Sequence, residues 1–307
     1  MSTIEAGKPA GVFDFDGFLA HLNGEKFRDV HAAEFCKQTG FPRQRYDLLY
    51  SFADNLHKTL VTFAPNRFGW IYEGVVTASG RADVMVTQTA VTSLMLAILR
   101  IDPFFASKRL NLPSKENEDR FLQELYGKSY NPEFVELQEG LFDVLRELDG
   151  FLAIHIVTNS SDANVRKAIE KGDQRIFNLV TIRGDAKKYY VDPKWEGIKR
   201  VKMKIPGYGL DINLRRPKFY AKLEEILKEN PKIVTAGGDI YPLDAAMFLE
   251  LSQTDSRFQG ITSFLMQTLY TPTAEAKFFK ENNANGLFLI TNLGQIPAIL
   301  RERLNPS

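Results

Sequence analysis

The chain has 307 residues, of which 44% are hydrophobic, and it carries 39 basic and 38 acidic side chains. A chain of this length can bury a large core in two domains, and its balanced charge excludes a general attraction to nucleic acid or membrane surfaces. Cys36 is the only cysteine, which excludes an intrachain disulfide. Because the N-terminus also has no apolar signal segment, we expect a cytoplasmic protein.

The first informative segment is an apolar run that ends in two carboxylates, Val12-Phe-Asp14-Phe-Asp16-Gly17. The run predicts a strand, and open α/β sheets build their ligand sites at the carboxyl ends of strands. Residues two apart in an extended stretch point the same way, so Asp14 and Asp16 can serve one pocket. One carboxylate can attack an electrophile while the other carries a proton for the leaving group. A calcium-binding loop or a surface turn can have the same sequence, so the assignment depends on matching motifs later in the chain.

Residues 21–149 have helical periodicity and few strand signals. Prolines separate the expected helices, which span residues 25–39, 44–62, 82–100 and 116–125. The most apolar window, 84–101, contains threonine, serine and glutamine, so we expect a buried helix and no membrane span. A further helix is predicted from Asn131-Pro132 to Gly150, with its apolar face formed by residues 134, 137, 141, 145 and 148.

The next buried strand is predicted over residues 151–157, and a helix is expected over residues 162–171. Between them lie Thr158, Asn159 and two serines. A hydroxyl followed by free backbone N–H groups at a helix start can hold a phosphate. Taken alone, a threonine in this position is more often a helix cap, so Thr158 indicates phosphate binding only together with the other motifs.

A basic segment follows a strand expected over residues 177–182. Residues 188–191 and 198–205 alternate like two strands, which predicts a β-hairpin insertion over 185–212. Residues 183–218 carry eleven basic and four acidic side chains, a net charge of +7, whereas the rest of the chain has −6. The segment is either a solvated face or a surface that contacts substrate or a partner.

The last third of the chain reads as alternating helices and strands. Arg216-Pro217-Lys218 opens an amphipathic helix, which leaves Lys218 in the first turn, where it can reach an anion. The strand over 232–236 ends in Gly237-Gly238-Asp239, and Asp244 follows five residues after Asp239. Two carboxylates at a strand end suit Mg²⁺. Further strands are expected over 260–266 and 286–291, each followed by a helix, over 272–281 and 295–304.

Four motifs in this order resemble those of haloacid dehalogenase-type phosphohydrolases: Asp14-Phe-Asp16-Gly17, Thr158, Lys218, and Gly238-Asp239 with Asp244. The resemblance covers residues 11–20 and 130–300. It implies an α/β fold with a doubly wound, mostly parallel, Rossmann-like sheet, formed by residues 1–20 and 150–307. Residues 21–149 would be a helical cap that closes over the site, and 185–212 a β-hairpin flap. Phe18 departs from the motif, which usually has threonine or a smaller aliphatic residue after the glycine.

The resemblance also implies roles for the two carboxylates and for Mg²⁺. Asp14 would be the nucleophile that forms an aspartyl-phosphate, and Asp16 would protonate the leaving oxygen and later activate water. The metal would be bound by Asp14, the backbone carbonyl of Asp16, and Asp239. Asp244 would either hydrogen-bond the groups that hold the metal or pair with Lys218. It could equally be an acidic residue at a helix N-terminus, where it interacts favourably with the helix dipole.

Phosphate binding is assigned to Thr158, Asn159 and Lys218 on the same basis. The function expected is therefore a Mg²⁺-dependent phosphatase that acts on a small phosphomonoester, and the partner is a phosphorylated metabolite, with the basic segment favouring substrates with more than one anionic group. The alternatives are a phosphotransferase or phosphomutase, a phosphonatase, which needs a Schiff-base lysine from the cap, and a non-catalytic protein that binds a phosphate ligand. Intact catalytic carboxylates argue against the last.

Overall fold

The structure is a computed structural model that describes residues 7–101, 104 and 110–304. Its contacts divide the chain into two compact units, which are described separately. The core unit comprises Met1–His21, Ile71–Ala78 and Glu136–Ser307, and the helical unit comprises Leu22–Trp70 and Ser79–Val135. A short segment from the middle of the predicted cap, residues 71–78, thus belongs to the core unit.

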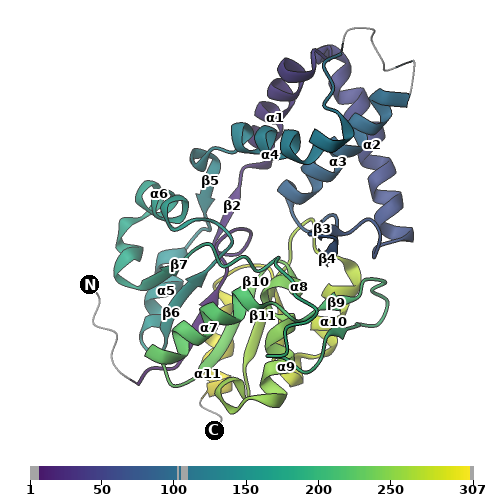
Figure 1. Ribbon diagram of the computed structural model, residues 1–307. Coiled ribbons are helices and arrows are strands. Elements are labelled where there is room, and N and C mark those ends of the chain that lie inside the picture. The colour runs from purple at the N-terminus through teal and green to yellow at the C-terminus, as the bar shows by residue number, and fades with distance from the viewer. Residues whose placement is uncertain (1–6, 102–103, 105–109, 305–307) are drawn as a thin grey trace. The chain divides into compact units, whose positions relative to one another are not determined.

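A six-stranded parallel sheet forms the centre of the core unit, in the order β12-β11-β10-β1-β6-β7 (Figure 1). The first strand therefore lies inside the sheet, and the chain adds strands on one side of it before it crosses to the other. This arrangement confirms the predicted α/β fold class with a parallel sheet. The strands are β1 (Ala10–Phe13), β6 (Ala153–Val157), β7 (Val180–Arg183), β10 (Ile233–Gly238), β11 (Thr262–Met266) and β12 (Leu287–Ile290).

The register of the three central strands places their carboxyl ends together. Phe13, the last residue of β1, pairs with Gly237 of β10 on one side and with Ile156 of β6 on the other. Residues that follow these three strands therefore meet at one edge of the sheet, where the strand order reverses. This is the place at which open parallel sheets bind ligands.

Helices and short turns connect the strands of the core unit, and their apolar faces, with Phe219, Leu223 and Phe248 among them, pack with Val12 and Leu265 of the sheet. The α-helices are α5 (Leu141–Asp149), α6 (Asp162–Gly172), α7 (Pro217–Glu229), α8 (Tyr241–Asp244), α9 (Ala246–Thr254), α10 (Thr273–Glu281) and α11 (Gln295–Leu304). The 3₁₀ turns are η3 (Gln174–Asn178), η4 (Ser256–Phe258) and η5 (Asn283–Asn285).

The helix predicted to start at Asn131-Pro132 was wrong in its first part. Residues Pro132–Phe134 form a 3₁₀ turn, η2, and β5 (Val135–Leu137) pairs with β2 (Ala20–Leu22). Gly140 then adopts a left-handed φ of 71°, and α5 begins after it. Glycine reaches such a φ at no steric cost, so the chain can turn at Gly140 between β5 and α5. The regular spacing of apolar residues continues across this turn, and the prediction therefore merged the strand and the helix.

The predicted hairpin over 185–212 was also wrong in its pairing. The strands are β8 (Lys202–Met203) and β9 (Ile212–Asn213), which pair antiparallel, and residues 188–191 form no strand. Arg215 donates hydrogen bonds to the carbonyl oxygens of Pro193, Ile198 and Lys199. These carbonyls are held by a side chain in place of a neighbouring strand.

The helical unit contains α1 (Gly24–Thr39), α2 (Arg43–Phe63), α3 (Val84–Ile101), η1 (Lys115–Asn117) and α4 (Glu118–Ser129). A hairpin, β3 (Trp70–Tyr72) and β4 (Val75–Ala78), interrupts this helical sequence and lies mainly in the core unit. Among the described residues, α3 alone has the length and hydropathy that a membrane span requires. Val91, Met95 and Leu99 of α3 are buried in the core of the helical unit, as expected for a core helix.

Candidate active site

Asp14 is the first residue after β1, and the residue is almost fully buried, with 7% of its surface exposed. Its backbone amide donates a hydrogen bond of 2.8 Å to the carbonyl oxygen of Gly237, so the chain beyond the strand is still held by β10. A rigid backbone at a strand end fixes the direction of the carboxylate, which a nucleophile requires.

A buried lysine contacts this carboxylate. Nζ of Lys188 lies 2.8 Å from Oδ1 of Asp14 and 2.5 Å from Oδ1 of Asp244, and the lysine is 1% exposed. The backbone N–H of Lys188 donates to Oδ1 of Asn159 at 2.7 Å. A buried ammonium is stable only where it is paired and hydrogen-bonded, and two carboxylates meet that need here.

The pKa values of the pair follow from burial and from their attraction. Burial raises the pKa of Asp14 to about 7, against the opposing attraction of Lys188 and with the support of Asp244 and Asp16. Burial alone would lower the pKa of Lys188, but Asp14 and Asp244 outweigh it and the pKa is raised. Lys188 is therefore an ammonium ion at neutral pH, and its charge lies against the carboxylate of Asp14.

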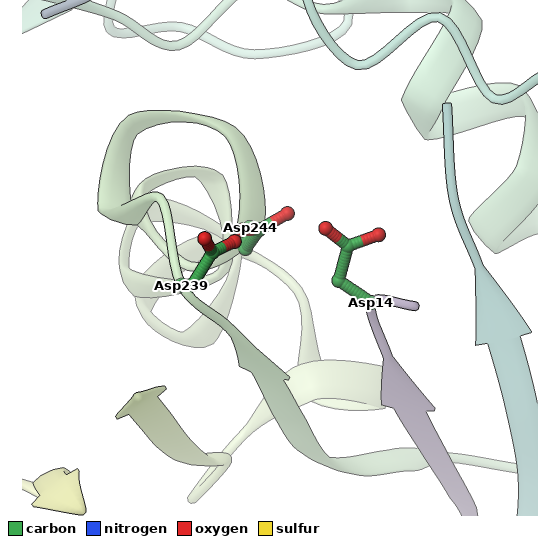
Figure 2. Close-up of side chains that lie close together, drawn as sticks. All are labelled: Asp14, Asp239 and Asp244. Carbon is green, nitrogen blue, oxygen red and sulfur yellow. The ribbon is translucent and has the colours of Figure 1, made fainter. Parts of the chain in front are cut away.

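Asp239 and Asp244 complete a cluster of three buried carboxylates. Asp239 follows β10 and Asp244 ends α8, and Figure 2 shows both side chains close to that of Asp14. Each of the three offers one oxygen, and these oxygens lie within 4.8 Å of one another. The second oxygen of Asp244, Oδ2, accepts a hydrogen bond of 3.0 Å from the backbone N–H of Ile240. Gly17 has a φ of 79°, and a side chain there would collide with Asp239.

The carboxylate of Asp16 accepts hydrogen bonds from two hydroxyl groups. Oδ2 of Asp16 accepts hydrogen bonds from Thr158 Oγ1 at 3.1 Å and from Ser160 Oγ at 2.7 Å. The hydroxyl of Thr158 in turn accepts from the backbone N–H of Ser160. Burial raises the pKa of Asp16, and the two hydroxyl hydrogen bonds oppose that rise. A carboxyl with a raised pKa can hold the proton that a general acid donates.

The structure brings most of the residues predicted from the sequence to this edge of the sheet. The carboxylates and the hydroxyl of the four motifs lie there: Asp14, Asp16, Thr158, Asp239 and Asp244. Asn159 lies beside them, with its side-chain oxygen on the backbone of Lys188.

Lys218 is not in this cluster. Its side chain is exposed, and its Nζ lies 5.9 Å from the centre of the Tyr190 ring. Lys188 takes the place that the sequence reading gave to Lys218, and Asp244 pairs with Lys188. Lys188 and Ser160 are the residues that the sequence reading missed. No local pattern separates Lys188, which is buried, from Lys187, which is exposed.

Phe18, the departure from the motif, has a packing role. Its ring is fully buried and stacks on Phe13, with centroids 5.9 Å apart and planes 8° apart. A side chain at Gly237 would collide with this ring. The larger residue after Gly17 is therefore accommodated by a glycine on the neighbouring strand.

The donor set fits a hard divalent cation. The cluster brings three carboxyl groups and one ammonium together, and carboxylate oxygens are the ligands that Mg²⁺ prefers. Both oxygens of Asp244 are already engaged, one with the ammonium of Lys188 and one with the backbone N–H of Ile240. Asp14 and Asp239 are therefore the residues that would hold the metal directly.

No protein-family model and no curated protein matches the chain. A HAD-hydrolase from Bacillus subtilis, YfnB, described as bound to magnesium, is similar in structure, with 14% identity, a TM-score of 0.46, and coverage of 96% of this chain and 99% of that one. A predicted phosphoglycolate phosphatase from Haemophilus somnus has 12% identity and a TM-score of 0.48, covering 97% of this chain and 100% of that one.

A haloacid dehalogenase-like hydrolase from Streptococcus pneumoniae has 12% identity and a TM-score of 0.44, with coverage of 97% of this chain and 100% of that one. In these comparisons the chain is similar to haloacid dehalogenase-like hydrolases, the family that its motifs resemble.

Proposed function

We propose that this protein is a Mg²⁺-dependent phosphohydrolase that cleaves a small phosphomonoester through an aspartyl-phosphate on Asp14. One observation carries the proposal. The buried Asp14 carboxylate, at the end of a central strand, contacts the Lys188 ammonium and lies in one cluster with Asp239 and Asp244. Such a group can attack phosphorus while fixed charges stabilise the transferred phosphoryl group.

The residues divide the work between the two steps. In the first, an oxygen of Asp14 bonds to phosphorus and the ester oxygen leaves with a proton from Asp16. In the second, Asp16 takes a proton from a water molecule that attacks phosphorus and releases Asp14. Lys188 holds Asp14 in place and offsets the negative charge that gathers at the phosphoryl oxygens. When bound, Mg²⁺ supplies positive charge that lets a carboxylate and a phosphate approach.

Lys188 is not the Schiff-base lysine that the phosphonatase alternative needs, because that lysine would come from the cap and Lys188 lies in the core unit. A phosphonatase forms a Schiff base through a neutral lysine amine. The pKa of Lys188 is raised by Asp14 and Asp244, so this lysine is an ammonium ion and serves as a fixed cation. The aspartyl chemistry proposed here needs that charge.

The proposed substrate is a small phosphorylated metabolite, and we propose that the basic segment favours substrates with more than one anionic group. Acidic residues offset part of the charge of that segment. Lys202 and Lys204 both lie near Asp211, at 3.5 and 3.2 Å. Lys188 and Arg216 are buried, so the field at the surface comes from the exposed members of the segment, Lys187, Lys194, Lys199 and Arg200 among them. Closure of the helical unit over the site and a cytoplasmic location stay predictions.

A panel of phosphorylated metabolites, assayed with Mg²⁺, tests the proposal. We expect release of inorganic phosphate from at least one class of phosphomonoester, and its loss in the Asp14→Asn variant, which keeps the shape of the side chain and removes the nucleophile. A turnover rate of Asp14→Asn within tenfold of the wild-type rate would contradict the proposal.

A further inference from the structure

Arg216 is a fully buried arginine with 0% exposure, and the mechanism above does not use it. Its guanidinium donates hydrogen bonds to three backbone carbonyls: Asn213 at 3.1 Å, Thr77 at 2.7 Å, and Lys188. These three acceptors are distant from one another in the sequence. Burial of a guanidinium costs free energy unless its N–H donors are hydrogen-bonded, and these three bonds meet that need.

The acceptor on Lys188 is the carbonyl of the lysine that contacts Asp14. The backbone of Lys188 is thus held on both sides, since its N–H donates to Asn159 and its carbonyl accepts from Arg216. No regular strand or helix covers residues 184–201, and a side chain from such a segment needs other constraints to stay in one place. The two hydrogen bonds provide them.

The acceptor on Thr77 belongs to the hairpin segment, residues 71–78, which the core unit takes from the middle of the long insertion. Asn213 reinforces this contact, because its Nδ2 donates to the carbonyl of Val76 at 2.8 Å. Strand β4 of the hairpin also packs against α8, the helix that ends at Asp244. Arg216 therefore joins the backbone of Lys188 to the hairpin that flanks its second ion-pair partner.

We propose that Arg216 is the positioning residue for Lys188: its fork of hydrogen bonds fixes the backbone that places the lysine Nζ against Asp14, and it makes the 71–78 hairpin part of the active site. This inference deepens the proposed function and rests on it for the kinetic part of the test. A misplacement of about 1 Å at a reacting group can cost on the order of 10²-fold in rate.

The neighbouring residue provides a matched control. Arg215 also donates to three backbone carbonyls, those of Ile198, Pro193 and Lys199, but none of them belongs to Lys188. Arg216→Gln and Arg215→Gln each remove a charge and a set of carbonyl hydrogen bonds. Only the first releases Lys188. Arg216→Lys keeps the charge and loses the planar fork, so it separates positioning from charge.

The test combines NMR of Lys188 with kinetics. The side-chain signal of Lys188 is assigned by its loss in Lys188→Met, and kcat and KM are measured with para-nitrophenyl phosphate and Mg²⁺. In Arg216→Gln we expect the Lys188 signal to move and kcat to fall on the order of 10- to 100-fold, with a smaller change in KM. Arg216→Lys should stay impaired, and Arg215→Gln should leave the Lys188 signal and kcat unchanged. Combined with Lys188→Met, Arg216→Gln should cost little more, because both act through one group.

An unmoved Lys188 signal in Arg216→Gln, or full additivity with Lys188→Met, would overturn the inference. If Arg216→Gln does not fold, Arg216→Lys is measured in its place, with the same expectations. A wild type that hydrolyses no phosphomonoester would contradict the proposed function, and the NMR signal would still decide whether Arg216 positions Lys188.

Discussion

Replacement of Lys188 by methionine tests directly what the buried positive charge contributes to the site. The substitution keeps most of the side-chain volume and removes the ammonium that lies 2.8 Å from Asp14 and 2.5 Å from Asp244. Loss of one partner of a buried ion pair costs about 3–5 kcal/mol when the other charge stays buried. Here the carboxylates can avoid part of that cost by binding a proton.

Proton binding would itself harm catalysis. Burial already raises the pKa of Asp14 to about 7, and the attraction of Lys188 opposes a further rise. Without Lys188 the pKa of Asp14 rises further, so a smaller fraction of Asp14 is ionised at neutral pH. Each unit of that rise lowers the ionised fraction by at most a factor of ten. Loss of a fixed charge beside the phosphoryl group adds to this. We expect kcat/KM to fall by about 10²- to 10³-fold.

The assay is phosphate release from para-nitrophenyl phosphate with Mg²⁺, with folding checked by circular dichroism. Lys218→Met is the matched control, because Lys218 is the lysine that the sequence motif favoured and its side chain is exposed. We expect this control to change kcat/KM by no more than about threefold, since exposed charges contribute little. A larger loss in Lys218→Met than in Lys188→Met would refute the assignment of Lys188.

Three further predictions concern the metal, the basic segment and acid stability. Protein treated with a chelator should lose phosphatase activity and regain it with Mg²⁺, while Ca²⁺ should inhibit through its larger coordination sphere; full activity without metal would contradict the Asp14–Asp239 site. Charge reversal at Lys199, Arg200 and Lys202 should lower kcat/KM more for bisphosphates than for monophosphates, and less at high salt, because the screening length is about 8 Å at physiological ionic strength; equal effects on both would leave the segment as solvated surface. Burial lowers the pKa of His155 to about 4 from 6.5, so the unfolded chain binds a proton that the folded chain excludes, and stability should fall by at most about 3 kcal/mol as the pH drops from 6.5 to 4. His155→Gln should reduce this dependence in thermal unfolding, and an unchanged dependence would show that His155 does not cause it.

The strand-end carboxylates could be predicted from the sequence because each follows directly on a buried apolar run. Asp14 and Asp239 come at the ends of β1 and β10, and Thr158 follows β6. In a parallel sheet, the ends of neighbouring strands meet whatever the connections do. The fold class followed from the same alternation of strands and helices.

The lysine could not be predicted in this way. Lys188 comes from an irregular segment, and its place depends on hydrogen bonds to Asn159 and Arg216, from other parts of the chain. Lys187 and Lys188 are equivalent in sequence, and only the tertiary structure buries one of them. The hairpin at 71–78 was hidden for the same reason, because a short pair of strands within a helical sequence gives little periodicity.

The central claim is that Asp14 becomes phosphorylated during turnover. The direct measurement is an acid quench of the enzyme during hydrolysis of para-nitrophenyl phosphate with Mg²⁺, followed by borohydride reduction, which converts an aspartyl-phosphate to homoserine, and peptide mass mapping. The account predicts homoserine at position 14 in the wild type and none in Asp14→Asn. Steady hydrolysis without modification of residue 14, or with modification at another residue, would contradict it.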